Sequence, residues 1–164
     1  MENFIQLKKD NILRFGIKDA EGNVIEGKYL EFDIEDISLP LRLNKMEIEH
    51  KKNLNSLKIQ LSALEKKEDK KGKYLLSWKE EEGLKIVKTF FEKEIDTLDL
   101  FLGKGMTRVL LNGREPYYEM FDDIVEMLQP IMPVIEENFT SLTDRIKQKY
   151  SKKETKEDGE LMSD

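Results

Sequence analysis

The stretch from Phe90 to Gly113, FFEKEIDTLDLFLGKGMTRVLLNG, constrains most strongly how this chain can fold. Its first half concentrates large apolar side chains: Phe90, Phe91, Ile95, Leu98, Leu100, Phe101 and Leu102. Gly103 and Gly105 then break the pattern, and Asn112-Gly113 breaks it again after three more apolar residues. Because this is the most apolar part of a highly charged chain, we expect the other elements to be organised around it.

Composition sets the class of protein. Hydrophobic and charged residues each make up 38% of the 164 residues, a balance that suits one domain of helices with narrow apolar stripes. The net charge of -6 argues against a general attraction to nucleic acid or to an anionic membrane. The chain has no Cys, hence no disulfide or thiolate metal site, and no stretch as long and apolar as a secretion signal or a membrane span. A cytoplasmic location is expected.

Residues 11–35 have the two-residue alternation of a β-hairpin. Apolar residues alternate with polar ones on both sides of the segment 19–23, DAEGN, whose Gly and Asn suit a tight turn. A two-stranded hairpin alone is marginally stable in water. Its apolar face is therefore expected to lie on the helices or to pair with another chain.

Two long helices should follow. Ser38 is a plausible cap for the first, and Asn44 followed by Glu47 marks a second possible start. The polar run 65–73 ends this helix, and Gly72 supplies the break. The apolar stripe of this helix is Leu43, Met46, His50, Leu54, Leu57, Leu61 and Leu64. Ser77 and Glu80 have the spacing of a capping box and predict the start of the second helix, which ends at Gly103.

The last helix is expected to begin near Glu115-Pro116. Its apolar residues recur at steps of three and four: Tyr117, Phe121, Ile124, Leu128, Ile131, Ile135, Phe139, Leu142 and Ile146. Pro130 and Pro133 each cost about 3 kcal/mol in a straight helix, so the sequence predicts a kink or a break into two helices there. We therefore expect one domain over residues 1–150 and a disordered polar tail over residues 151–164.

No pattern of residues predicts catalysis, a cofactor or a metal site. His50 is the only histidine, and a structural or surface role is expected for it. The carboxylates near the apolar run, such as Asp96 and Asp99, match no catalytic or metal motif and are expected on solvated faces or as helix caps. Gly103-x-Gly105 follows a helix and lacks the lysine of a phosphate loop, so it is interpreted as a helix stop. The chain is expected not to be an enzyme.

A second apolar face near the last helix has two interpretations. It contains methionines, which suit surfaces that accept more than one partner but also fill ordinary cores. As a hypothesis, the partner-binding residues are Tyr117, Tyr118, Met120, Met127 and Met132. The core is then built from Phe91, Ile95, Leu98, Phe101, Ile124 and Leu128.

Residues 91 to about 139 resemble the tail assembly chaperones of long-tailed bacteriophages and of prophages in Gram-positive bacteria. The resemblance consists of the acidic, phenylalanine-rich FFEKEIDTLDLFLGKG, then VLLNGRE, a Tyr, and the amphipathic MFDDIVEMLQPIMPVIEE. The chain departs from the family pattern at Leu102 and at Leu111-Asn112-Gly113, where Phe-Gly is usual. The match covers about a third of the chain and rests on apolar and glycine positions.

The resemblance implies a helper protein that binds the tape measure protein in the host cytoplasm, keeps it soluble and assists polymerisation of the tail tube. The major tail tube protein and a second copy of the chain are further candidate partners; nucleic acid and membranes are not. The alternative is a virion structural or adaptor protein of the tail, in which the hairpin edge pairs between subunits. The expected fold is α+β and predominantly helical, with an amino-terminal β-hairpin, long helices and a Pro-kinked carboxy-terminal helix.

Overall fold

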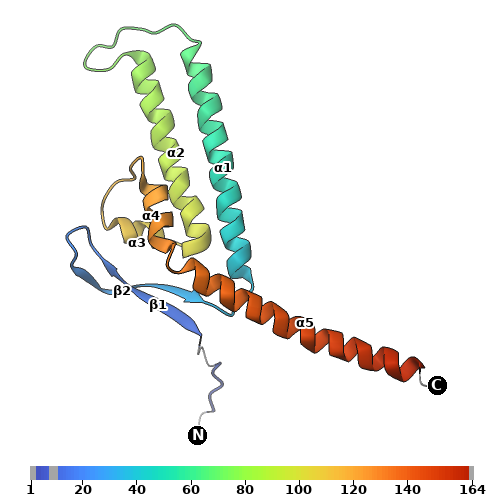
Figure 1. Ribbon diagram of the computed structural model, residues 1–164. Coiled ribbons are helices and arrows are strands. Elements are labelled where there is room, and N and C mark those ends of the chain that lie inside the picture. Colours follow the sequence, from blue (N-terminus) through green and yellow to red (C-terminus); the bar gives the residue numbers. More distant parts are fainter. Residues whose placement is uncertain (1–2, 8–10, 163–164) are drawn as a thin grey trace.

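The protein is an α+β, predominantly helical fold, as the sequence predicts. A computed structural model describes the backbone of residues 3–7 and 11–162, and side chains only as far as residue 151. The elements are β1 (Ile12–Lys18), β2 (Val24–Asp33), α1 (Ser38–Glu65), α2 (Trp78–Leu102), α3 (Met106–Leu111), α4 (Met120–Leu128) and α5 (Met132–Met162). Helices α1 and α2 lie side by side, the hairpin, α3 and α4 gather at one end of this pair, and α5 runs away from it (Figure 1).

The β-hairpin packs on the helices. Strands β1 and β2 are antiparallel, and Leu13 lies opposite Phe32. The ring of Phe32 is 2% exposed and stacks on Phe101 of α2, with ring centroids 5.2 Å apart. At the predicted turn, the Asp19 carboxylate accepts hydrogen bonds from two backbone N–H groups of the turn. The apolar face of the hairpin therefore lies on the helices of the same chain, which is the first of the two expected locations.

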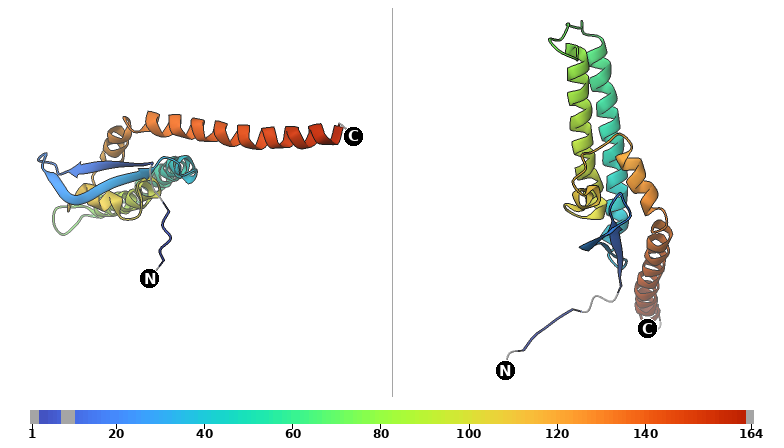
Figure 2. Two further views of the ribbon diagram at one scale, coloured as in Figure 1. Left: turned by 90° about the horizontal axis from the view of Figure 1, so that it is seen from below. Right: turned by 90° about the vertical axis from the view of Figure 1, so that its left-hand side faces the viewer.

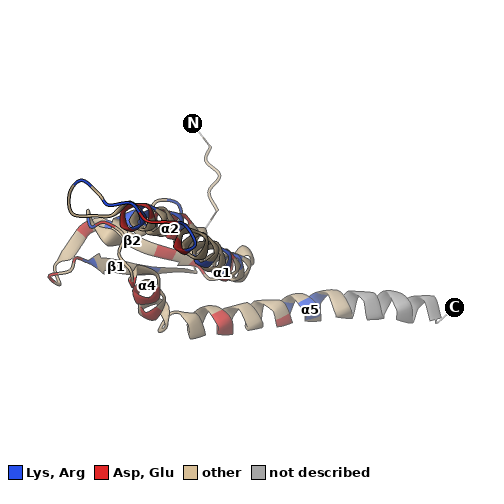
Figure 3. Cartoon of the chain, turned by 90° about the horizontal axis from the view of Figure 1, so that it is seen from above, with Lys and Arg blue, Asp and Glu red and all other residues tan. Residues whose placement is uncertain are grey.

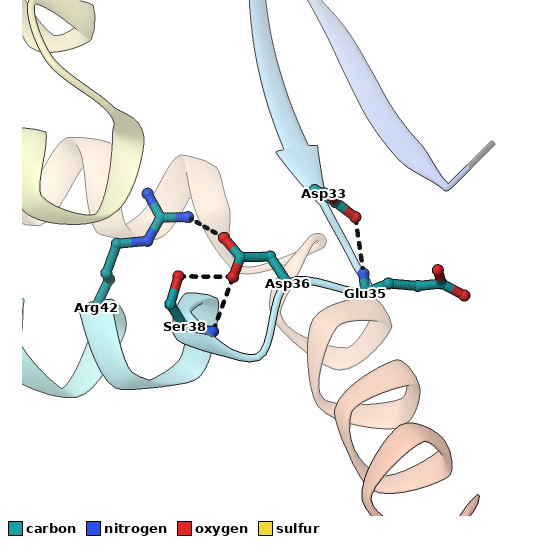
Figure 4. A network of polar contacts seen from close by, with 5 residues as sticks. All are labelled: Asp33, Glu35, Asp36, Ser38 and Arg42. Carbon is teal, nitrogen blue, oxygen red and sulfur yellow. Dashed lines mark hydrogen bonds and ion pairs between the residues drawn. The ribbon is translucent and has the colours of Figure 1, made fainter. Parts of the chain in front are cut away.

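The junction between β2 and α1 is held by carboxylates (Figure 4). Asp36 accepts hydrogen bonds from the backbone N–H of Ser38 at 2.9 Å and from its hydroxyl at 2.7 Å, and its other oxygen lies 3.3 Å from the Arg42 guanidinium. Asp33 accepts one from the N–H of Glu35. The prediction that Ser38 caps the helix is wrong: Ser38 is the first helical residue, and Asp36 satisfies its free N–H group.

The second half of α2 forms the centre of the core. The predicted capping box is confirmed, because the Ser77 hydroxyl accepts from the N–H of Glu80 and the Glu80 carboxylate accepts from the N–H of Ser77. Five of the six predicted core residues are buried: Ile95, Leu98, Phe101, Ile124 and Leu128. Phe91 is only partly buried. The apolar stretch that begins at Phe90 therefore does occupy the position expected from the sequence.

The last helical pattern is divided into two helices. Helix α4 begins at Met120, not near Pro116 as predicted, because residues 115–119 form the turn that carries the Tyr117 side chain back over α4. It ends at Leu128, and α5 begins at Met132 with Pro133 in its first turn, where the missing N–H costs nothing. The sequence predicts a kink or a break at the two prolines, and the structure has a break between α4 and α5.

Helix α5 projects from the rest of the molecule (Figure 2). Its backbone is helical to Met162. The sequence predicts a disordered tail over residues 151–164, and this stays a prediction, because the side chains beyond residue 151 and the last two residues lie outside the described part. Among the described residues, no helix has the length and apolar character needed to cross a bilayer.

Candidate functional site

The structure separates the five residues of the predicted partner-binding face. Met120 is 1% exposed and belongs to the core, and Met132 is half-buried against that core. Tyr118 is 85% exposed and Met127 is 47% exposed, while Tyr117 is half-buried. Met120 therefore packs in the core and Met127 stays accessible, and the partner-binding role of this face stays a prediction.

Tyr117 and Met127 meet at an apolar groove of about 530 Å³ between the hairpin and α4. The groove is lined by Phe15, Gly16, Ile17, Lys18, Leu30, Leu110, Leu111, Tyr117, Asp123, Ile124, Met127, Pro130 and Ile131. Its volume is within the range of roughly 300–1,000 Å³ typical of binding pockets, and most of its lining is aliphatic or aromatic. A hollow of about 630 Å³ along α5 is lined chiefly by polar and charged side chains, so it lacks such an apolar surface.

One side of the groove is fixed by contacts of Tyr117. The phenol donates a hydrogen bond of 2.8 Å to the Asp123 carboxylate, and the Arg114 guanidinium lies over the ring, 3.8 Å from its centroid. Partial burial raises the pKa of the Tyr117 phenol, and the hydrogen bond to Asp123 raises it further. The phenol therefore stays protonated at neutral pH and keeps Tyr117 beside α4.

A buried polar cluster ties α4 to the long helices. Glu94 of α2 is 1% exposed, and its carboxylate accepts a hydrogen bond of 2.9 Å from the Asn53 amide and lies 2.5 Å from Nδ1 of His50. Asn53 also donates to the hydroxyl of Thr97. The ring of Phe121 on α4 stacks on His50, with centroids 3.6 Å apart and planes within 3°. The contacts of His50 agree with the structural role expected for it.

The turn after α2 is organised by Asp99. Its carboxylate accepts hydrogen bonds from the N–H groups of Gly105 and Thr107 and from the Thr107 hydroxyl. Asp99 therefore caps α3, which is one of the two roles the sequence predicts for it. Gly103 and Gly105 have positive φ angles of 109° and 78°, which residues other than glycine rarely adopt. These two glycines therefore end α2, as predicted.

Among the residues whose placement is described, no three His, Asp or Glu side chains are grouped so that they could hold a metal ion. A comparison of the chain with protein-family models, with curated proteins and with solved structures finds no match.

The sequence pattern predicts binding residues on and just before α4, but it does not indicate the residues of the other wall of the groove. Phe15, Ile17 and Leu30 come from the hairpin, more than eighty residues away in the chain. The alternation of apolar residues in β1 and β2 predicts that one side of the hairpin is buried. It does not predict which helix packs against that side. The signal that could have been used is the apolar run at 109–111, whose Leu110 and Leu111 bridge the two walls.

Proposed function

We propose that this protein is a tail assembly chaperone of a long-tailed phage or prophage. It binds the tape measure protein in the host cytoplasm, keeps it soluble and assists polymerisation of the tail tube. The observation that carries the proposal is the apolar groove, because its wall α4 lies within residues 91–139, the segment that resembles this family. Residues of both walls belong to the same apolar core cluster as Phe101 of α2, so the groove is part of the folded domain.

The groove suits an extended apolar helix as its occupant. A partner helix with apolar residues at steps of three and four presents one stripe, and a groove between a hairpin and a helix accepts such a stripe. Met127 is half-exposed at its edge, and the flexible, polarizable methionine side chain adapts to different partner residues. The negative net charge of the chain helps a complex with an apolar partner remain in solution.

The test is co-expression with the apolar coiled-coil-like protein encoded downstream. We expect the soluble yield of that partner to rise and the two proteins to co-purify. Met127→Gln, which keeps the length of the side chain but makes it polar, should lower the co-purified yield. Ile59→Gln is the control, because Ile59 is 61% exposed on α1 and does not line the groove. A partner that stays insoluble in the presence of the native chain would refute the proposal.

A virion structural or adaptor protein is the second candidate, favoured by the free edge of the sheet. The hairpin is a two-stranded sheet, so β1 has hydrogen-bonding groups on the side away from β2 that could pair with another strand. Such a protein stays in the tail, whereas a chaperone leaves it. Detection of the chain in purified particles at a fixed ratio to the tube protein would favour this candidate.

A further inference from the structure

Charge is distributed very unevenly along the chain. Residues 115–144 contain no Lys, Arg or His. The acidic residues in this segment are Glu115, Glu119, Asp122, Asp123, Glu126, Glu136, Glu137 and Asp144, which contribute -8 against a net charge of -6 for the whole chain. The segment covers α4, which is one wall of the groove, and the first part of α5, which lines a separate hollow with Glu136, Glu137 and Asp144.

On α4 the carboxylates lie on the side away from the core. Met120, Ile124 and Leu128 form the buried face, and Figure 3 shows acidic residues on the same helix. Asp123 lines the groove together with Met127, one turn further along. Glu119 and Glu126 stand four residues before and three residues after Asp123, so they share its side of the helix. The apolar groove therefore has an acidic margin.

Asp123 of this margin accepts the hydrogen bond of the neutral Tyr117 phenol, which leaves its negative charge in place. In the described part of the chain, no ion pair involves a carboxylate of α4, and the groove lining contains a single cation, Lys18. Carboxylates three and four residues apart repel one another and destabilise the helix. The helix dipole offsets this for Asp122 and Asp123 in the first turn, but it disfavours Glu126 in the last turn. The stability of α4 therefore does not explain why all of these carboxylates lie on this helix.

We infer that the segment bound in the groove is a basic amphipathic helix. Its apolar stripe enters the groove, and Lys or Arg residues along one side of that stripe meet Glu119, Asp123 and Glu126. This inference rests on the chaperone function proposed above and specifies its client: apolar contact holds the helix, and charge selects which apolar helix is accepted. Complementary charge also speeds the encounter and disfavours segments with acidic flanks.

Three synthetic helical peptides test the inference. They share one Leu stripe and carry Lys, Gln or Glu at the flanking positions, and their affinity for the full chain is measured by fluorescence anisotropy. We expect the Lys peptide to bind at least tenfold more tightly than the Gln peptide and the Glu peptide to bind most weakly. The preference should shrink at 1 M salt, where the Debye length is about 3 Å.

Variants of the protein assign the preference to the groove margin. Glu119→Gln with Glu126→Gln should weaken the Lys peptide about two- to thirtyfold, the range expected for two exposed ion pairs, and leave the Gln peptide unchanged. Glu47→Gln with Glu92→Gln removes the same charge from exposed positions on α1 and α2 and should change nothing. Met127→Gln should weaken all three peptides.

Equal affinity for the Lys and Gln peptides would overturn the inference, as would a Lys preference that is undiminished in the Glu119, Glu126 variant. Peptide binding that does not change in Met127→Gln would overturn it too. If the tape measure partner is nevertheless kept soluble, the proposed function stands and only the basic character of the client is wrong. If no peptide binds and the partner remains insoluble, both fail.

Discussion

Replacement of Phe101 by Ala tests the core assigned to α2. Phe101 is 1% exposed, it stacks on Phe32 of the hairpin, and it lies in the same apolar cluster as Leu98 and Leu102. Truncation of a buried Phe removes its transfer free energy and leaves a cavity, at a cost of about 3–5 kcal/mol. Because a domain is stable by about 5–15 kcal/mol, the loss is a large share of the total. At roughly 2–4 °C per kcal/mol for this chain length, Tm should fall by about 6–20 °C.

The measurement is thermal unfolding followed by circular dichroism, with urea unfolding for the free energy. Phe4→Ala is the matched control, because it makes the same chemical change at a side chain that is 85% exposed and should leave Tm within about 1 °C. A double-mutant cycle of Phe101 with Phe32 should give a coupling of about 0.5–1.5 kcal/mol for the stacked pair. A Tm for Phe101→Ala equal to that of the control would refute the assignment of this residue to the core.

Three further variants probe polar contacts. Glu94→Ala removes the acceptor of Asn53 and the partner of His50 and should cost roughly 2–5 kcal/mol in urea unfolding, more than Glu94→Gln, which keeps an acceptor oxygen. The hydrogen bond from the Ser38 hydroxyl lowers the pKa of Asp36 below 3.8. The stability that the Asp36 carboxylate contributes is therefore complete above about pH 4 and is lost as the pH falls through its folded pKa. Asp36→Asn should therefore lower Tm at pH 6, and its difference from the native chain should shrink as the pH falls through the folded pKa of Asp36. Asp99→Ala should cost about 0.5–2 kcal/mol, because α3 loses its cap.

The elements that short-range patterns specify could be predicted from the sequence. The period of two in residues 11–35, the turn at Asp19, the capping box at Ser77 and the glycines after α2 each depend on neighbours within a few positions, and each is found where expected. The start of α4 was predicted wrongly for the complementary reason. A proline at position 116 permits a first turn there, but the contact of Tyr117 with Asp123 favours a turn instead.

Contacts between distant segments could not be predicted. The periodicity of the last helix placed Met120 on a secondary face, yet its spacing of four from Ile124 and eight from Leu128 is the spacing of the buried face. The choice between the two faces is made by what packs against α4, and the hairpin lies far away in the chain. The partnership of Glu94 with His50 is hidden for the same reason, since the two residues are forty-four positions apart.

Two positions on α2 take part in anchoring the two walls of the groove. The hairpin wall is held by the stacking of Phe32 on Phe101, and the α4 wall by the stacking of Phe121 on His50, which bonds to Glu94. Glu94 and Phe101 are seven residues apart, so they share one face of α2 about 10.5 Å apart along its axis. Neither residue lines the groove, yet each anchors one of its walls. A variant at either position that still folds should therefore bind the partner less well, which a role confined to stability would not produce.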